Sequence, residues 1–427
     1  MSVGKAGLIA SVKGESTASG IMGQPSSMKQ ALSALGVMLL SATVARAQLP
    51  TEPISVADGR VVLGAEVSAT VASDDPGFFN YTDYEYSALR NLRIGVSAQL
   101  RASRWLQVLG ELRFDHGNHV EPSALYARIR PWPNRRFDIQ AGRIPATFGI
   151  FGRQTYGTAN LLIGTPLAYQ YLTSLRPDSL PATTGDLLRM RGRGWLSNFP
   201  LGVTAADRGL PLINGVRADT GVQVHGVNGV VEWTGAVTTG SLSNPRVGDD
   251  NGGRQLVGRM VANPIAAVRL GVSAARGAYL SRVLESSLPA GSRLEDAVQQ
   301  AVGVDAEYSE GRFLARAEVI RSYWTLPFAL SEGGNQRLGA HAVLVEGRYR
   351  IFPGVQLAAR AERLDFARIQ AGGLMERWEA PVQRLEAGAS YSIIRNVTVK
   401  ASVQRNSRDG GRIQRDTLGA MQVVYWF

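Results

Sequence analysis

Arginine side chains recur at alternate positions in two short stretches of the sequence. Arg128 and Arg130 are separated by one residue, and Arg189, Arg191 and Arg193 repeat the same spacing. Residues two apart point to the same side of an extended strand, so each stretch would form a row of guanidinium groups. Such rows attract anions. Arg316, Arg348 and Arg360 are further candidates for this positive surface, and Asp178 and Asp186 are the acidic candidates opposite it.

Carboxylates on similar stretches leave a second interpretation of the arginines open. In this interpretation the arginines form salt bridges that hold a wall of strands rigid, and they select no solute. The carboxylates in question are Glu111, Glu232, Glu307, Glu318, Glu346, Glu362 and Glu386.

Residues suited to catalysis are scarce. The chain has no cysteine and four histidines, which excludes thiol nucleophiles, cysteine zinc sites and disulfides. His225 and His341 have no recognisable nucleophile motif nearby, and His116 and His119 are interpreted as part of a solvated loop. The sequence therefore predicts no enzyme, and no catalytic, cofactor-binding or metal site.

The elements that would position the arginines are β-strands. From Leu92 to Arg101 every even position is apolar and most odd positions are polar or small, which is the two-residue period of a strand with one wet and one dry face. The same alternation recurs along most of the chain. No stretch approaches the roughly 20 apolar residues of a transmembrane helix.

The connections between these strands alternate between short turns and long polar loops. This order is typical of an antiparallel membrane β-barrel with small turns on one side and large loops on the other. Counting predicts an all-β transmembrane barrel of about eighteen strands over residues 59–427. Sixteen is the alternative, if the weak segments after Leu188 are not both strands.

The two faces of the strands also favour a barrel. The apolar face is often built of small side chains, as in Val355, Leu357, Ala359 and Ala361, which are sufficient against lipid. The opposite face carries paired charges that require a wet interior. A soluble β-solenoid or propeller would need a repeat of tens of residues, and none is found.

The N-terminal residues predict export. From Met28 a lysine, an apolar stretch and the small-x-small triplet Ala45-Arg46-Ala47 follow one another, as in a secretory signal peptide. Residues 1–47 are therefore predicted to be removed. The 27 residues before Met28 are either a long n-region of the signal or the result of a start assigned too early, in which case the chain begins at Met28. Residues 48–58 would form a short periplasmic segment, too short for the plug domain of an energised transporter.

The C-terminal strand supplies a resemblance to a known class. Phe427, Tyr425, Val423 and Met421 lie on one face and end the chain in an aromatic residue. This row resembles the C-terminal signature of Gram-negative outer-membrane proteins. The resemblance implies location in the outer membrane, contact with its lipid, and recognition by the barrel-assembly machinery.

The third long loop, predicted over residues 144–188, is too apolar to extend freely into water. In porins, which the chain resembles, such a loop folds inward and narrows the channel. Packing of this loop on neighbouring loops or on another subunit remains the alternative.

The start of the third loop resembles a porin subgroup. The stretch from Gly142-Arg143 to Phe148-Gly149 is similar to the Gly-Arg/Gln-x-x-x-Pro-Phe-Gly pattern of phosphate-selective O/P porins. The proline is displaced, and Lys400 is the only lysine after the predicted signal, whereas those porins have a lysine-rich path. Phosphate is therefore not predicted as the solute.

Together these features predict an outer-membrane porin, a passive diffusion channel for small hydrophilic solutes. The arginines favour anions. A barrel without a channel, acting as an adhesin, an anchor or a hydrolase, is the alternative. Assembly as a homotrimer is left open, and no cofactor or nucleic-acid partner is expected.

Overall fold

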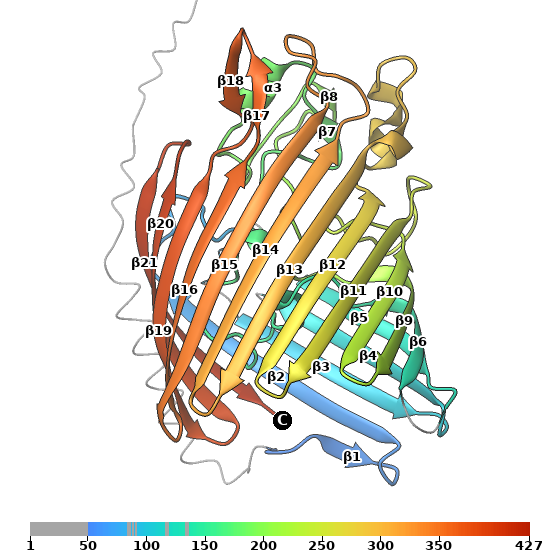
Figure 1. Ribbon diagram of the computed structural model, residues 1–427, viewed down its shortest axis with the longest axis vertical. Helices are drawn as coiled ribbons and strands as arrows, with labels where there is room; N and C mark the ends of the chain where they lie inside the picture. The colour runs from blue at the N-terminus through green and yellow to red at the C-terminus, as the bar shows by residue number, and fades with distance from the viewer. Residues whose placement is uncertain (1–49, 83–86, 88, 90–91, 116–118, 133–135) are drawn as a thin grey trace, which may run out of the picture. The chain divides into compact units, whose positions relative to one another are not determined.

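A closed barrel of sixteen antiparallel strands forms the body of the protein. The computed structural model describes residues 50–82, 87, 89, 92–115, 119–132 and 136–427 (Figure 1). The barrel strands are β2 (Val61–Ala72), β3 (Leu92–Arg101), β4 (Leu106–Asp115), β5 (His119–Ile129), β6 (Phe137–Ile144), β9 (Asp219–Asn228), β10 (Val231–Thr238), β11 (Gln255–Ile265), β12 (Val268–Ala278), β13 (Val298–Glu310), β14 (Phe313–Thr325), β15 (Arg337–Phe352), β16 (Val355–Phe366), β19 (Val382–Ile394), β20 (Val397–Arg408) and β21 (Arg415–Trp426).

The first and last barrel strands close the ring. Residues 66–72 of β2 pair with residues 420–426 of β21, and the other edge of β2 pairs with β3. A short extra strand, β1 (Ile54–Val56), pairs with the start of β2 and lies within the predicted N-terminal segment. Residues 1–47, the predicted signal peptide, lie outside the described residues.

The strand count corrects the expectation of eighteen, and the alternative of sixteen is confirmed. The weak segments after Leu188 are not barrel strands, because they belong to the connection between β6 and β9. That connection, residues 145–218, is called L3 below. It extends thirty residues beyond the predicted end of the third loop at position 188.

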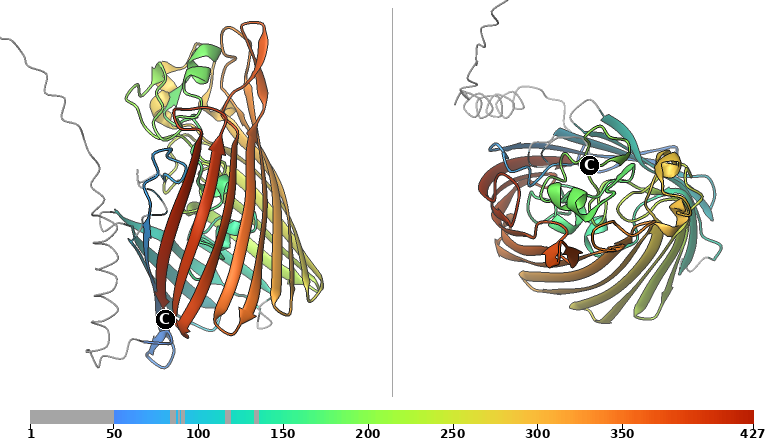
Figure 2. Two further views of the ribbon diagram at one scale, coloured as in Figure 1. Left: turned by 90° about the vertical axis from the view of Figure 1, so that its left-hand side faces the viewer. Right: turned by 90° about the horizontal axis from the view of Figure 1, so that it is seen from above.

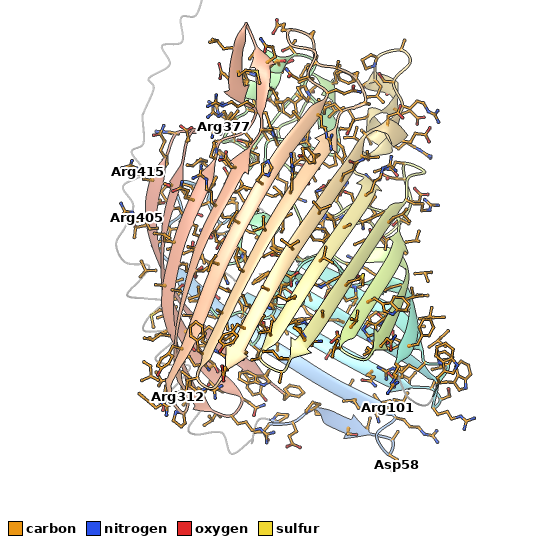
Figure 3. The ribbon with its side chains drawn as sticks, in the orientation of Figure 1. Asp58, Arg101, Arg312, Arg377, Arg405 and Arg415 are labelled. Carbon is orange, nitrogen blue, oxygen red and sulfur yellow. The ribbon has the colours of Figure 1, made fainter. Side chains whose placement is uncertain are left out.

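The two faces of the wall differ as the alternation predicts. Outward positions such as Val302, Val304 and Leu385 are apolar and more than half exposed, whereas the inward positions of the same strands carry buried charged residues, such as Asp305 and Glu386, among small ones. Labelled charged residues lie toward the two ends of the wall, with Arg405 and Arg415 nearer the loops and Arg101 and Arg312 nearer the turns (Figure 3). An apolar band between charged edges suits a barrel surrounded by lipid. Among the described residues, no helix is long and apolar enough to cross a membrane.

Short turns gather at one end of the barrel and long loops at the other (Figure 1). The loop end carries three further small elements besides L3: the 3₁₀ helices η2 (Arg282–Ser287) and η3 (Leu294–Asp296), and the hairpin of β17 (Arg368–Ala371) with β18 (Leu374–Arg377). These ends are called the turn side and the loop side below.

L3 folds into the barrel, as the apolar content of its sequence predicts. It contains η1 (Phe151–Arg153), α2 (Leu167–Gln170), β7 (Ser179–Leu180), α3 (Thr184–Arg189) and β8 (Leu201–Gly202). Seen from above, its ribbon occupies the interior of the ring of strands (Figure 2). Phe148, Leu167 and Tyr169 are buried in one cluster with Ala301 and Ala342 of the wall. Small inward side chains on the wall thus make room for the large side chains of L3.

The loop-side half of L3 is held by its neighbours. The buried carboxylate of Glu379, in the loop between β16 and β19, accepts hydrogen bonds from the backbone N–H of Ser174, at 2.7 Å, and of Gly192. Burial raises the pKa of Glu379, although these backbone donors act in the opposite direction. Residues 170–218 therefore form a cap tied to the other loops.

Candidate permeation site

Residues 147–169 of L3, called the lumen segment, contact the barrel wall from many directions. Their partners lie on β2, β4, β9, β12, β14, β16, β19 and β20. A segment bonded to wall strands in so many directions lies in the middle of the lumen, where any solute would have to pass it.

Glutamates of the wall hold the lumen segment through its backbone. Glu66 accepts from the N–H of Gly157 at 2.7 Å, and Glu386 accepts from the N–H of Gly164 at 3.0 Å. Glu318 accepts from the N–H of Ile150 at 2.9 Å and from the hydroxyl of Tyr169 at 2.8 Å. Each of these carboxylates accepts from the backbone of L3, so the contacts fix the path of the chain through the lumen.

Gly149 permits the close approach of L3 to the wall. Its φ is +72°, a conformation that favours glycine, and a Cβ there would lie 2.1 Å from the Tyr169 hydroxyl. Phe148 beside it is fully buried. The Gly142-to-Gly149 stretch that resembles the porin subgroup is therefore the point where the chain leaves β6 and docks on β12 and β14.

Cations of the wall bind the carbonyls of the lumen segment. Lys400 donates to the carbonyls of Gly157 and Asn160, both at 2.5 Å, and Arg384 donates to Thr165 at 3.0 Å. Arg360 donates to the carbonyl of Gly164 at 2.7 Å. These groups serve as structural partners of L3.

Arg360 is also the centre of a buried ionic network. It is 2% exposed and lies 2.8 Å from Glu346, 3.8 Å from Glu362 and 3.6 Å from Glu386. Arg360 therefore fits the interpretation in which arginines form salt bridges that stabilise the wall, rather than the one in which they select anions.

Replacing Arg360 with alanine is expected to lower the free energy of unfolding by about 3–5 kcal/mol, because three carboxylates lose their buried counter-charge. Urea unfolding in lipid vesicles measures this loss. The matched control is Arg363→Gln, since the Arg363 side chain is exposed and its half-buried partner Asp365 keeps Arg377 as a second partner, and its effect should stay within about 1 kcal/mol. Equal losses in both variants would contradict the assignment.

A cavity of about 430 Å³ remains between the lumen segment and the wall of β4, β5, β6 and β9. Arg128 and Arg130 line it, as their alternation predicts; Arg128 lies on the turn-side half of β5, and Arg130 directly follows the end of that strand. Arg128 lies 3.9 Å from Asp138 and donates to the Tyr126 hydroxyl at 3.2 Å. The other charged residues that line the cavity are Asp138, Glu111, Arg113 and Arg217, and His225 also lines it. This space is called the lower cavity.

A second cavity, of about 470 Å³, lies on the loop side and is called the upper cavity. Arg143, Arg217 and Arg246 line it with Asp178 and Asp250. Burial lowers the pKa of the Arg246 guanidinium, although neighbouring carboxylates act in the opposite direction. Arg217 lines both cavities. Positively charged side chains therefore follow one side of the lumen from the loops toward the turns.

The stretch from Arg189 to Arg193 does not form the predicted strand. Arg189 ends helix α3, lies 3.7 Å from Asp186, and has an exposed side chain. Arg191 donates to the carbonyl of Asp409 at 3.1 Å, and Arg193 is exposed beyond a turn at Gly192. The alternation fails as a strand signal here because Thr183 and Asp186 form a capping box that starts a helix.

The two acidic candidates have different surroundings. Asp178 lines the upper cavity and accepts hydrogen bonds from Nε and Nη2 of Arg176, at 2.9 Å each. Asp186 accepts from the Thr183 N–H at 3.0 Å in the helix cap, away from the lining of both cavities.

The remaining predicted residues lie on the wall. Arg316 bonds Gln154 of L3 at 2.6 Å and lies 3.2 Å from Glu346, and Arg348 is a partly buried inward residue of β15. Met421, Val423, Tyr425 and Phe427 share the outward side of the last strand, with the rings of the last two 6.0 Å apart. Their recognition by the assembly machinery stays a prediction.

Sequence reasoning missed Arg143, Arg217 and Arg246 as lining residues. Arg143 is the second-last residue of β6, and Arg217 lies two residues before β9. Alternation gives no signal at such strand ends, and Arg246 lies in a loop. Only the position of Arg143 beside Gly142, within the porin-like stretch, could have indicated it.

The histidines form no catalytic arrangement in the part of the chain that the structure describes. His225 lies 3.7 Å from Asp138 and faces the lower cavity. His116 lies outside the described residues, as does the side chain of His119. No group of metal-ligating side chains occurs among the residues that can be described.

Comparison with known proteins places the barrel among solved structures. No family model matches the chain, and no curated protein matches it. The anion-selective porin from Comamonas acidovorans has 8% identity and a TM-score of 0.51, over 86% of this chain and 99% of that one. The chain has the porin fold.

Two further structures agree. The outer membrane channel DcaP of Acinetobacter baumannii has 10% identity and a TM-score of 0.50, over 88% of this chain and 100% of that one. OmpT, an outer membrane protein of Vibrio cholerae solved in a trimer form, has 11% identity and a TM-score of 0.50, over 86% of this chain and 99% of that one. At these identities the likeness concerns the fold alone.

Proposed function

We propose that the protein is an outer-membrane porin that conducts small hydrophilic solutes passively and prefers anions. The proposed path runs through the upper cavity, past Arg217, and through the lower cavity. The observation that carries the proposal is the continuity of arginines along this side of the lumen. The porin fold and the apolar outer band support location in the outer membrane.

Charge along the path favours anions. The lower cavity is lined by four arginines and two carboxylates, and the upper cavity by three arginines and two aspartates. Both aspartates of the upper cavity are ion-paired, Asp178 with Arg176 and Asp250 with Arg246. An excess of guanidinium groups in a narrow, low-dielectric passage raises the local concentration of anions. No step of this mechanism changes the solute chemically, so no enzyme activity is proposed.

The zero-current potential in a planar bilayer under a KCl gradient tests the proposal. With residues 48–427 refolded, we expect discrete conductance steps and a reversal potential that favours chloride. Conductance steps with a reversal potential that favours potassium would support the porin function but contradict the anion preference. A folded barrel without steps would instead support the alternative of an anchor or adhesin whose lumen is closed by L3.

The porin proposal is compatible with a homotrimer but does not require one. The trimer form of the Vibrio cholerae protein supports it by analogy of fold. Sedimentation in detergent, which gives the mass of the protein complex, decides it.

A further inference from the structure

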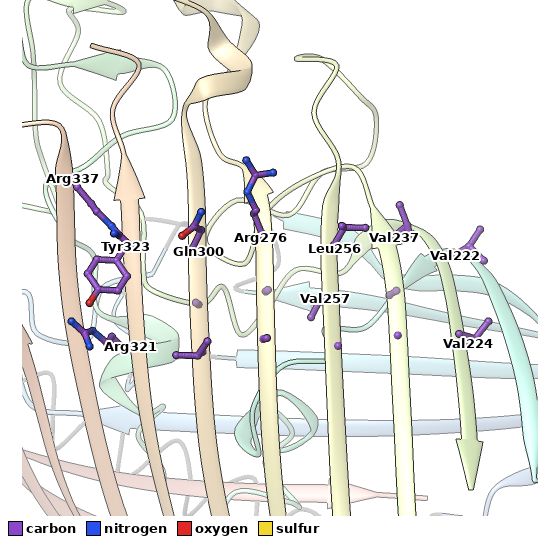
Figure 4. A pocket seen from close by; sticks show the side chains of 17 residues that line it. Val222, Val224, Val237, Leu256, Val257, Arg276, Gln300, Arg321, Tyr323 and Arg337 are labelled. Carbon is purple, nitrogen blue, oxygen red and sulfur yellow. The ribbon is translucent and has the colours of Figure 1, made fainter. Parts of the chain in front are cut away.

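A groove crosses the outer surface of the barrel on the loop side. Its volume is about 850 Å³, and it spans β9 to β15 (Figure 4). Outward side chains around it are apolar and exposed, such as Leu256 at 59% and Val302 at 56%. It is called the outer groove, and it lies on the opposite face of the wall from the two lumen cavities.

The outer groove exists because small residues meet in register. Gly235 of β10 pairs with Gly258 of β11, and Gly258 pairs with Ala274 of β12. The neighbouring outward pairs are larger: Val237 with Leu256 on one side, and Trp233 with Met260 on the other. Gly235, Gly258 and Ala274 thus form a row with almost no side-chain volume, and rows of larger side chains border it on both sides. The result is a trough the width of an acyl chain.

Three arginines stand at the rim of the outer groove. Arg276 is the next outward residue after Ala274 on β12. Arg321 lies on β14 and Arg337 on β15 (Figure 4). The guanidiniums of Arg321 and Arg337 lie 4.9 Å and 4.0 Å from the centre of the Tyr323 ring. Within the described residues, none of the three has a carboxylate partner. They differ in this from Arg316 and Arg360 of the lumen.

The position of the arginines indicates the occupant. They lie near the loop-side ends of their strands, above an apolar surface, at the level where lipid headgroups meet hydrocarbon. Guanidiniums bind phosphate through paired hydrogen bonds. A second copy of the chain would have to bury three uncompensated cations at this surface, which is unfavourable.

We propose that the outer groove binds a phosphorylated lipid of the loop-side leaflet. The phosphate groups would bind Arg276, Arg321 and Arg337, and an acyl chain would lie along the row of Gly235, Gly258 and Ala274. The site lies outside the lumen, so it does not depend on the proposed channel function.

Binding of diphosphoryl lipid A tests the proposal. The delipidated protein, reconstituted in phosphatidylcholine nanodiscs, is titrated with this lipid, and bound lipid is counted by native mass spectrometry. We expect Arg276→Gln/Arg321→Gln/Arg337→Gln to weaken binding about tenfold or more, because each lost phosphate contact is charge-assisted. Lipid A without its phosphates should bind the unaltered protein weakly. Its affinity should match that of diphosphoryl lipid A for the triple variant.

A second variant tests the acyl-chain half of the site without touching a charge. Gly258→Leu should also weaken binding. A Cβ at this position would lie 3.8 Å from the carbonyl oxygen of Thr234, so it fits without a clash, and the larger side chain would fill the trough. Gly347→Leu is its control, because Gly347 is an outward residue on the turn-side half of β15 with comparable space. Arg405→Gln/Arg412→Gln/Arg415→Gln is the control for charge, on β20, on β21 and in the loop between them, away from the outer groove.

The outcomes separate the proposal from its alternatives. Equal weakening by the control variants, or unchanged binding by both test variants, would overturn it. Loss of oligomers in Gly258→Leu with lipid binding intact would also overturn it and assign the groove to a subunit interface. Each variant is verified as folded if its barrel resists unfolding in detergent without heating, as the unaltered protein is expected to do.

Discussion

Excising the core of the lumen segment is expected to raise the single-channel conductance several-fold. The change replaces residues 152–166 with a short glycine-serine linker between Phe151 and Leu167. This stretch supplies the contacts to Glu66, Glu386 and Lys400, so its removal leaves water where L3 now crosses the lumen. Conductance rises with the cross-section of the narrowest part of a pore.

The geometry favours folding of this deletion variant. The two ends of the excised stretch are already close, because the rings of Phe151 and Tyr169 lie 5.3 Å apart and Ile150 and Tyr169 both bond Glu318. Planar-bilayer recording measures the conductance. The control replaces the hairpin tip at Gly372 and Gly373, in the outer loop between β17 and β18, with the same linker. Unchanged conductance in the lumen-segment deletion would show that L3 does not narrow the path.

Replacing the arginines of the path is expected to abolish or reverse the anion preference. In Arg128→Gln/Arg130→Gln/Arg217→Gln, the lower cavity keeps Arg113 against Glu111 and Asp138. The permeability ratio of chloride to potassium should fall about threefold or more, because the fixed charges lie within one Debye length of the permeating ion. The zero-current potential measures the ratio.

Arginines that the sequence predicted but the structure keeps out of the cavities supply the matched control. Arg189→Gln/Arg193→Gln removes two exposed guanidiniums from the loop side without changing the lining of either cavity. Its permeability ratio should equal that of the unaltered protein. If this variant lost the preference and the path variant kept it, selectivity would reside in the cap rather than in the two cavities.

The sequence was sufficient for the wall of the barrel. Period-two alternation depends only on the geometry of an extended chain, so it correctly assigned the inward side of Arg128 and the shared face of Met421 and Val423. The sequence was not sufficient for the number of strands. The residues after Leu188 alternate over a few positions, but they are packed in a cap held by Glu379, and local spacing carries no information about that packing.

By itself, the sequence determined the all-β class, the two faces of the strands, the order of turns and loops, and the inward fold of an apolar third loop. Only the tertiary structure decided which arginines share a passage. Arg143, Arg217 and Arg246 lie on three separate segments, and they come together because L3 is anchored on Glu66, Glu318 and Glu386 across the lumen. Strand periodicity is a local property, whereas the path left between a loop and a wall depends on contacts between residues 91 to 222 positions apart.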